Sequence, residues 1–463
     1  MDLYRPIFHF MPQKNWMNDP NGLIYYKGEY HLFYQYNPYG DKWGTIHWGH
    51  AKSLDLVHWE HLPIALFPSG ELGEEHCFSG CAVVKDGVPS IFYTSVGSGD
   101  RHQSIGAQQW MAASNDDMVT WEKFNGNPVL TLDAHNGLDI KEWRDPFVWK
   151  ERETWYMVVG GSIEGRGCAL IYSSPDLINW GFLNKLYEGS EEIWECPNLF
   201  KLEDKYVLIY SPSDVVKYYI GQLNSDFSFT PEAHGTIDYS GWEGFYAPNS
   251  LADDRGRRIM WGWMTENSRG EFFGGAGWAG VQSIPRILSL QEEGKLRIEP
   301  LPELQVLREA HQRFENVIIS TPNWALGVKG RALEIIAEFE LHDNKTKFGL
   351  KLLCSPDGTE ETIVSFDPIT GHFSVDRSKS SLSNQPHSSI LIGKLDLTAG
   401  EVLRFHIFLD HSIIEVFANY KECISTRIYP TCSSSMNLNL FAEEGGSVGL
   451  KLLDVWKMKS IWN

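Results

Sequence analysis

The sequence predicts an all-β chain that folds as a five-bladed β-propeller followed by a β-sandwich domain. Two observations lead to this fold. A polar turn recurs five times at intervals of roughly 50–65 residues, which is close to the length of one four-stranded propeller blade. After about residue 300 the chain keeps its strand-like pattern but loses this repeat, which indicates a second β domain of a different kind.

The repeated turn contains a short motif that ends in proline or glycine. Its five copies are Asn18-Asp19-Pro20, Phe78-Ser79-Gly80, Arg144-Asp145-Pro146, Glu195-Cys196-Pro197 and Tyr246-Ala247-Pro248. Each copy precedes a short β-rich run, a tight turn and a second β-rich run, as expected for the two inner strands of a blade. A second motif, an aspartate followed four residues later by tryptophan, occurs at Asp55, Asp117 and Asp176 and suits the outer part of a blade.

The domain boundaries follow from the place where the repeat ends. The repeat extends from about Phe8 to Leu290, and Pro300 and Pro302 then precede a short amphipathic pattern. We therefore predict the propeller over residues 1–298, a linker with a short helix over residues 299–313 and the sandwich over residues 314–463.

Composition restricts the partners. The 463 residues carry a formal net charge of −20, which argues against nucleic acid and anionic membranes because both require basic patches. No apolar run approaches the roughly 18–20 residues needed to span a membrane. The first residues do not resemble a secretory signal. We expect a cytoplasmic protein, or a secreted one if a signal peptide has been removed.

Cofactors, metals and disulfides are not expected. The seven cysteines include no C-x-x-C pair, so neither a disulfide framework nor a zinc site is indicated. Two His-x-x-His spacings, which begin at His47 and His58, lie in strand-like surroundings with interleaved tryptophans, and we do not expect them to bind metal.

Three of the five turns carry a carboxylate, namely Asp19, Asp145 and Glu195. An aspartate in such a motif is often only a turn former. In a propeller, however, the inner strands of all blades begin at the same end of a central channel, so matched carboxylates converge there. We therefore predict an active site built from three distant parts of the chain.

These residues suit the cleavage of a glycosidic bond, which requires a protonated acid and a carboxylate at the anomeric carbon. Glu195 follows the apolar Trp194, and this drier setting should raise its pKa, so we assign it as the acid/base. Asp19 has neighbouring asparagines to hydrogen-bond an anion and is assigned as the nucleophile. Asp145 follows Arg144, whose charge should keep it ionised to hold sugar hydroxyls.

The motifs resemble the three signature motifs of glycoside hydrolase family 32, which includes invertases, sucrose-6-phosphate hydrolases, levanases, inulinases and some fructosyltransferases. The likeness covers nearly the whole chain, including residues 16–22, 31–38, 285–286, 376–381 and 410–417. It implies the same two domains and the same three roles, with Asp145 as transition-state stabiliser. The substrate-binding residues expected from this likeness and from the repeat are Trp16, Asn18, Gln35, Trp43, Phe78, Ser79, Arg144, Tyr246 and Trp278. The chain departs from frequent family residues at Cys81 and Asn249.

The expected activity is that of a retaining β-fructofuranosidase that acts on sucrose or short fructo-oligosaccharides through a covalent intermediate on Asp19. The alternatives on the same site are a fructan exo-hydrolase of levanase or inulinase type, a sucrose-6-phosphate hydrolase and a fructosyltransferase. A non-catalytic fructan-binding protein is a distant alternative. A phosphorylated substrate would require basic rim residues, for which Lys42, Arg101 and Arg269 are candidates. The sequence fixes neither the leaving group nor the oligomeric state.

Overall fold

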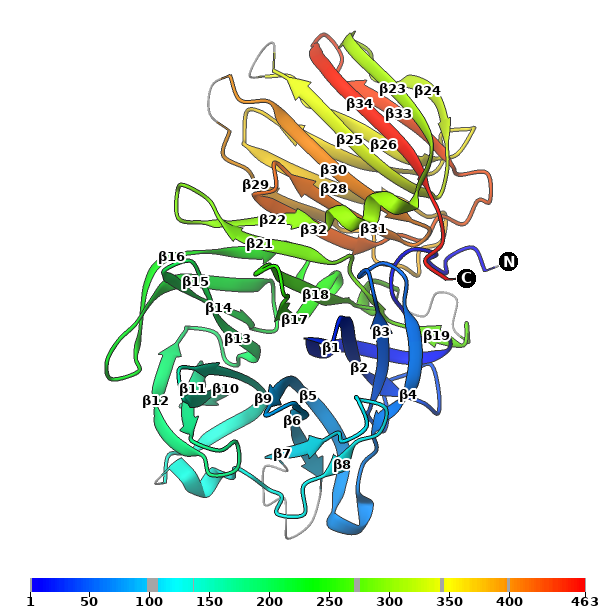
Figure 1. Cartoon of the computed structure of the whole chain (residues 1–463). Coiled ribbons are helices and arrows are strands. Elements are labelled where there is room, and N and C mark those ends of the chain that lie inside the picture. Colours follow the sequence, from blue (N-terminus) through cyan, green and yellow to red (C-terminus); the bar gives the residue numbers. More distant parts are fainter. Residues whose placement is uncertain are drawn as a thin grey trace.

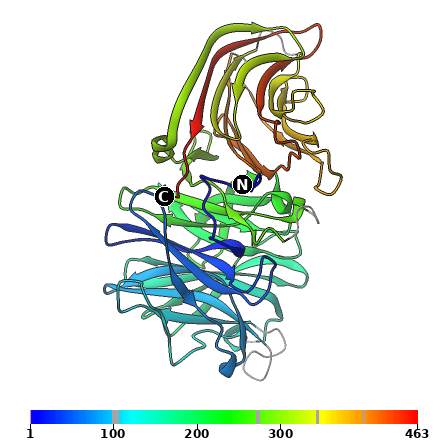
Figure 2. The same cartoon turned by 90° about the vertical axis from the view of Figure 1, so that its right-hand side faces the viewer.

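The computed structural model describes residues 2–97, 107–135, 137–269, 275–341, 345–397 and 400–462. Five sheets surround a channel and two further sheets pack on each other, which confirms the predicted propeller and sandwich. Figure 1 shows the sandwich, coloured from yellow-green to red, standing on one side of the propeller. Both chain termini lie at the junction between the two domains in Figure 1 and in Figure 2.

Each blade is an antiparallel sheet whose strands pair in chain order from the innermost outwards. Blade 1 consists of β1 (Asn15–Tyr26), β2 (Glu29–Asn37), β3 (His47–Ser53) and β4 (Glu60–Leu66), and blade 2 of β5 (Glu74–Lys85), β6 (Val88–Gly97), β7 (Ala107–Ala113) and β8 (Glu122–Lys123). Blade 3 consists of β9 (Ile140–Glu151), β10 (Thr154–Ile163), β11 (Arg166–Ser174) and β12 (Gly181–Glu188). Blade 4 consists of β13 (Glu195–Leu202), β14 (Lys205–Ser211), β15 (Val216–Leu223) and β16 (Phe229–Asp238). Blade 5 consists of β17 (Phe245–Ala252), β18 (Arg258–Met264), β20 (Val281–Gln282), β21 (Arg286–Leu290) and β22 (Leu296–Pro300).

The five repeated motifs lie inside the inner strands β1, β5, β9, β13 and β17, and not in turns before them. In each inner strand two residues face a single residue of the neighbouring strand, which defines a β-bulge. The bulged pairs are residues 18–19, 78–79, 145–146, 196–197 and 247–248. Proline is tolerated at such positions because the extra residue has no partner in the ladder. The repeat is therefore real, but its structural element is a bulge.

The ring of blades is closed by contacts between blade 5 and β1. The short β19 (Trp278–Ala279) pairs with β1 in parallel. Next to it, Gly280 adopts φ +81°, and a Cβ at this position would lie 1.7 Å from the carbonyl oxygen of Met17. Only glycine allows this approach. The side chain of Gln282 then donates from Nε2 to the carbonyl oxygen of Asn18 at 2.8 Å.

The aspartate-tryptophan motif forms the turn between the third and fourth strands of a blade. In blades 1 and 3, Oδ1 of Asp55 and of Asp176 accepts hydrogen bonds from the backbone N–H groups two and three residues ahead, at 2.9 and 2.8 Å. In blade 2 this acceptor role falls to Asp116, which accepts from the backbone of Thr120 at 2.8 Å. Asp117, the residue indicated by the sequence, forms an ion pair with Lys27 instead.

The connection between the domains differs from the predicted linker. Strand β22 continues to Pro300, the short helix is a single 3-10 segment η5 (Pro302–Leu307), and β23 (Arg308–Ile319) begins at once. Much of the stretch 299–313 therefore belongs to strands. The other 3-10 segments are η1 (Gly70–Leu72), η2 (Leu132–His135), η3 (Gly241–Glu243) and η4 (Asn267–Arg269).

The sandwich consists of two six-stranded sheets. One has the order β23, β34 (Val448–Met458), β25 (Ala332–Glu340), β30 (Leu403–Asp410), β31 (Ile413–Ala418) and β32 (Glu422–Arg427). The other has the order β24 (Trp324–Lys329), β33 (Asn437–Ala442), β26 (Phe348–Cys354), β27 (Glu361–Asp367), β28 (His372–Lys379) and β29 (Ile390–Lys394). Their facing apolar side chains form one core. No helix in the described part of the chain is long and apolar enough to cross a membrane.

A buried charged cluster joins the two domains. Arg286 of blade 5 donates from Nη2 to Oε2 of Glu415 in the sandwich at 2.6 Å and contacts Oδ2 of Asp238 at 3.1 Å. His9, in the segment before the first blade, contacts Glu415 at 3.0 Å and Asp410 at 2.9 Å. All five side chains are fully buried. A buried charge without its partner is costly, so the cluster requires both domains to dock in one arrangement.

We expect Arg286→Met to destabilise the protein by about 3–5 kcal/mol, because the substitution leaves Asp238 buried without its counter-charge and Glu415 with only His9. The control is Arg297→Met in the same blade, where the pair with Glu299 is only half-buried and contributes about 0–1 kcal/mol. Thermal unfolding measures both. Equal changes in Tm for the two variants would contradict the prediction.

Candidate active site

A cavity of about 230 Å³ lies where the five inner strands meet. Every inner strand contributes to its wall through the bulge or the residue next to it. The described residues that line it are Asn18, Asp19, Gln35, Trp43, Phe78, Arg144, Asp145, Glu195, Cys196, Trp242, Tyr246, Ala247 and Trp263. The three predicted carboxylates are therefore brought together, although they are far apart in the sequence.

The bulges aim side chains into the cavity at the cost of backbone strain. Asp145, Cys196 and Ala247, each followed by proline, adopt positive φ angles of 67°, 47° and 47°. This left-handed region is unfavourable for residues with a Cβ, and such outliers concentrate at functional sites. Glu195 is the residue before its bulge, so its position matches that of Tyr246 in blade 5 and not that of Asp145. The three carboxylates occupy similar but not identical places in the repeat.

Asp19 is held by amide and hydroxyl donors. Asn18 donates from Nδ2 to Oδ1 of Asp19 at 3.1 Å, and the hydroxyl of Ser79 donates to Oδ2. Gln35 links the two donors, since it accepts from Asn18 at 2.7 Å and donates to Ser79. Burial raises the pKa of Asp19 to about 7, against the effect of the Ser79 hydrogen bond, and the charge of Asp145 raises it further.

Asp145 is buried and accepts a hydrogen bond on Oδ2 from the backbone N–H of Cys196 at 2.9 Å. Burial raises its pKa to about 6, while the charge of Arg144 opposes this shift. The Cys196 thiol lies 3.5 Å from Asp145 and 3.6 Å from Oδ2 of Asp19, so it separates the two carboxylates. Burial raises the pKa of this thiol well above its ordinary value, which keeps it protonated.

Glu195 lies in a more polar setting than its sequence neighbours indicated. Its side chain keeps 21% of its surface exposed and receives Nη2 of Arg144 at 2.8 Å on Oε1. The hydroxyl of Tyr246 donates to Oε2 at 2.5 Å. The expectation that Glu195 is the drier carboxyl is therefore wrong, because burial acts on Asp19 and Asp145 instead. The charge of Arg144 favours the ionised form of Asp145, as expected from their adjacency, although the guanidinium itself reaches across to Glu195 in the next blade.

Six of the nine predicted substrate-binding residues line the cavity, namely Asn18, Gln35, Trp43, Phe78, Arg144 and Tyr246. Ser79 contributes to the site indirectly, through its hydrogen bond to Asp19. Trp16 is likewise one layer away, because its indole N–H donates to Oδ1 of Asn18 at 2.8 Å. Trp278 is not among the lining residues. It is buried in the ring closure, where its indole N–H donates to Asp2 at 2.7 Å.

Two lining tryptophans escaped the sequence analysis. Trp263 lies in β18, beside the bulge of blade 5. Trp242 lies in η3, four residues before Tyr246, and its side chain is 44% exposed. The only sequence signal was an aromatic residue shortly before the fifth motif, and eighteen tryptophans made that signal too common to use.

Hydrogen bonds between blades tie the inner strands together beside the site. Asn249 of blade 5 donates from Nδ2 to the carbonyl oxygen of Gly80 in blade 2 at 2.9 Å. Asn198 of blade 4 donates to the carbonyl oxygen of Pro248 at 3.1 Å. Asn249 and Cys81, the two departures from the family pattern, lie in these contacts between inner strands. The Sγ atom of Cys81 accepts from the backbone of Val148 at 3.1 Å.

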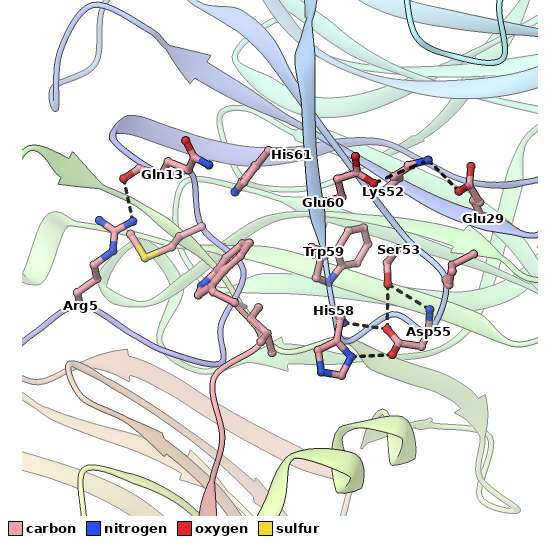
Figure 3. A pocket seen from close by; sticks show the side chains of 14 residues that line it. Arg5, Gln13, Glu29, Lys52, Ser53, Asp55, His58, Trp59, Glu60 and His61 are labelled. Atoms are coloured by element: carbon pink, nitrogen blue, oxygen red, sulfur yellow. Dashed lines mark hydrogen bonds and ion pairs between the residues drawn. The ribbon is translucent and has the colours of Figure 1, made fainter.

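A larger cavity of about 1080 Å³ lies elsewhere, on the outer strands of blade 1 near both chain ends. Figure 3 shows that its charged side chains are mostly paired, as in the Lys52–Glu29 and His58–Asp55 contacts at 2.9 and 2.7 Å. It contains none of the three predicted carboxylates. Size alone therefore does not identify the reactive site.

Within the described ranges, no three His, Cys, Asp or Glu side chains form a group suited to a metal ion. His50 instead contacts Nδ1 of His31 at 3.0 Å and stacks on Phe33. Of the proposed rim cations, Arg269 is buried beside Glu266 at 3.5 Å, and Lys42 is not among the residues that line the site. Arg101 lies outside the described residues.

Comparisons with known proteins agree with the two-domain fold. A family model described as "Glycosyl hydrolases family 32 N-terminal domain" matches residues 9–300, and one described as "Glycosyl hydrolases family 32 C terminal" matches residues 303–457. A sucrose-6-phosphate hydrolase of Zymomonas mobilis subsp. mobilis is 35% identical, with 96% of this chain and 90% of that protein covered. The levanase of Bacillus subtilis is also 35% identical and covers 99% of this chain and 71% of its own length.

A solved structure gives the same result in three dimensions. Fructan 1-exohydrolase IIa from Cichorium intybus superimposes with a TM-score of 0.89 at 28% identity, and the match covers 99% of this chain and 98% of that one. With both family models matched along almost its whole length, the chain belongs to glycosyl hydrolase family 32.

Proposed function

We propose that this glycoside hydrolase releases terminal β-fructofuranosyl units from sucrose or short fructo-oligosaccharides, with retention of configuration. The observation that carries the proposal is the meeting of Asp19, Asp145 and Glu195 in one cavity. Its volume of about 230 Å³ is below the about 300–1,000 Å³ of sites for drug-sized ligands, so it suits a single sugar ring. The related Cichorium intybus enzyme has been crystallised, as a variant, with 1-kestose.

In the first step an oxygen of Asp19 attacks the anomeric carbon of the fructosyl unit. The bond to the leaving oxygen breaks, and the proton of Glu195 passes to that oxygen. Arg144 and Tyr246, which both donate to Glu195, stabilise the carboxylate that remains. Asp145 stays beside the ring, where a negative charge or a hydrogen bond to a hydroxyl stabilises the oxocarbenium-like transition state.

In the second step the Glu195 carboxylate takes a proton from water, and the resulting hydroxide attacks the anomeric carbon. The bond to Asp19 breaks, fructose leaves, and both carboxyls return to their starting states. The charge of Asp145 raises the pKa of Asp19, so the ionisation of one aspartate depends on that of the other. The competent form has Asp19 ionised and Glu195 protonated.

A fructan exo-hydrolase is the second candidate, on the same chemistry. The levanase of Bacillus subtilis is among the relatives. The mouth of the cavity carries two exposed tryptophans, Trp43 and Trp242, which leave space for a leaving group longer than glucose. No described feature favours a phosphorylated leaving group, because Arg144 is the one cation among the described lining residues and it already binds Glu142 and Glu195.

We expect Glu195→Gln to lower kcat for sucrose by about 10²–10⁴-fold, the usual contribution of a general acid. On fructosyl fluoride, whose leaving group needs little protonation, the first step should be largely spared. Asp19→Asn should abolish turnover of both substrates, because no covalent intermediate forms. Glu192→Gln, at an exposed position three residues away, is the control. Equal losses of Glu195→Gln on both substrates would contradict the acid role.

The pH dependence should show the raised pKa of Asp19. Its ionised form is required, so kcat/KM should fall as the pH drops through a midpoint near 7 and well above the ordinary carboxyl value. Ser79→Ala removes a hydrogen bond that lowers this pKa, and the acidic limb should move to higher pH. Ser90→Ala, in the next strand of the same blade, should leave the limb in place. If the acidic limb of the kcat/KM profile stays in place or moves to lower pH in Ser79→Ala, it does not report the ionisation of Asp19.

The leaving group can be determined with sucrose, sucrose-6-phosphate, 1-kestose, inulin and levan, with products separated by chromatography. We expect fructose release from sucrose and 1-kestose, and single fructose units from longer chains. Oligosaccharides as the main product at high sucrose concentration would instead identify a fructosyltransferase. A lack of reducing sugar from every substrate would favour a non-catalytic binding protein.

A further inference from the structure

Trp242 is the outermost ring of an aromatic cluster that extends to Glu195. Its ring lies 4.2 Å from the ring of Tyr246 and stands edge-on to Trp263 at 5.9 Å. Tyr246 in turn donates to Oε2 of Glu195. Trp242 is exposed at the mouth of the cavity, whereas Asp145 at its bottom is buried. A group that leaves from Glu195 toward solvent therefore passes Trp242, and indole rings bind neutral sugar rings by apolar contact.

The turn that carries Trp242 is held from two sides. Thr265 and Asn267 of blade 5 both donate to the backbone carbonyl oxygen of Trp242 at 2.8 Å. The next residue, Glu243, is held by the sandwich instead. Because η3 contains only three residues, it has little internal structure of its own, and these outside contacts set its position.

The sandwich contacts on Glu243 form a compact clamp. Arg377, which is 1% exposed, donates from Nη2 to Oε2 of Glu243, and the hydroxyl of Ser389 donates to the same oxygen at 2.8 Å. Thr426 accepts from Nη1 of Arg377 at 2.8 Å and donates to the backbone oxygen of Glu243 at 3.2 Å. A Cβ at Gly244 would lie 1.8 Å from the carbonyl oxygen of Ser425, so η3 sits directly against β32.

The clamp is separate from the cluster that docks the domains. The docking cluster is built on Arg286, Glu415 and His9, and in the described part of the chain it forms no hydrogen bond or ion pair with Glu243 or Arg377. Domain docking alone thus does not require a buried arginine behind Trp242. The planar guanidinium of Arg377 holds Glu243 with Nη2 and Thr426 with Nη1 at the same time, and its fixed fork of donors suits this double contact better than a lysine ammonium.

We infer that Arg377 of the sandwich domain is a positioning residue for the leaving-group side of the active site. Through Glu243, Arg377 fixes the position of η3, so that Trp242 contacts the neutral sugar that leaves, whether glucosyl or fructosyl. The sandwich thereby contributes to substrate selectivity without touching the substrate. This inference rests on the proposed fructosyl hydrolase function and adds to it which domain sets the leaving-group preference.

The test compares sucrose with methyl β-D-fructofuranoside, which has the same fructosyl unit but no sugar as leaving group. For Trp242→Ala and for Arg377→Met we expect the ratio of kcat/KM for sucrose to that for the methyl fructoside to fall about tenfold, which corresponds to about 1.4 kcal/mol. The loss should be mainly in KM, since binding and not chemistry is affected. Inhibition by fructose, which occupies the bottom of the cavity, should stay unchanged.

The double variant Trp242→Ala/Arg377→Met should show no further loss, because both changes remove one interaction. Arg313→Met, on an ion pair with Asp454 in β34 of the sandwich, is the matched control and should leave the ratio unchanged. If Arg377→Met unfolds, Ser389→Ala and Glu243→Gln weaken the same clamp and should each lower the ratio by a smaller factor.

Three results would overturn the inference. If Trp242→Ala leaves the ratio unchanged, Trp242 does not contact the leaving sugar. If Arg377→Met loses activity equally on both substrates, the clamp is only a structural contact. Additive losses in the double variant would separate the two residues. Failure of the proposed function is distinguishable, since the wild-type enzyme would then release fructose from neither substrate. In that case the role of Arg377 is tested by calorimetry, which measures the binding of sucrose and of fructose to the wild type and to Arg377→Met. The substitution should weaken the binding of sucrose and leave that of fructose unchanged.

Discussion

The β-bulge in each inner strand is the constraint on which the active site depends. A regular strand would place its side chains alternately on the two faces of the blade. Two residues opposite one interrupt this alternation and turn Asp19 and Asp145 into the space between the blades. The strain at Asp145 and Cys196 is tolerated because neighbouring inner strands hold the backbone from both sides, as the bond from Cys196 to Asp145 shows.

The fold was readable from the sequence because the bulge leaves a local trace. Proline or glycine within a polar motif is costly elsewhere in a strand, so five copies at blade spacing identified both the repeat and the convergence of Asp19, Asp145 and Glu195. The sandwich was indicated only by strand-like runs after the repeat. The predicted linker over residues 299–313 extends too far, because Arg308 begins a strand whose exposed, polar composition does not resemble one.

The electrostatics of the site was not readable in the same way. Sequence neighbours indicated a dry Glu195, whereas the side chain of Glu195 stays partly exposed and binds Arg144 of the adjacent blade. Burial depends on which strands meet, and adjacent residues in a strand point to opposite faces. For the same reason Trp278 was assigned to the site although it closes the ring, and Trp242 was missed although it lines the mouth.

The bonds of Asn249 and Asn198 tie inner strands of different blades together beside the cavity, and we infer that substrate enters and leaves on the side of Trp43 and Trp242. A sugar that enters past Trp43 and Trp242 has to return along the same path. The part of the substrate that lies outside the cavity must therefore leave before the fructosyl unit inside the cavity can leave. A polymer cannot pass through a cavity that it must leave by the way it entered, so each catalytic cycle begins with a new binding event.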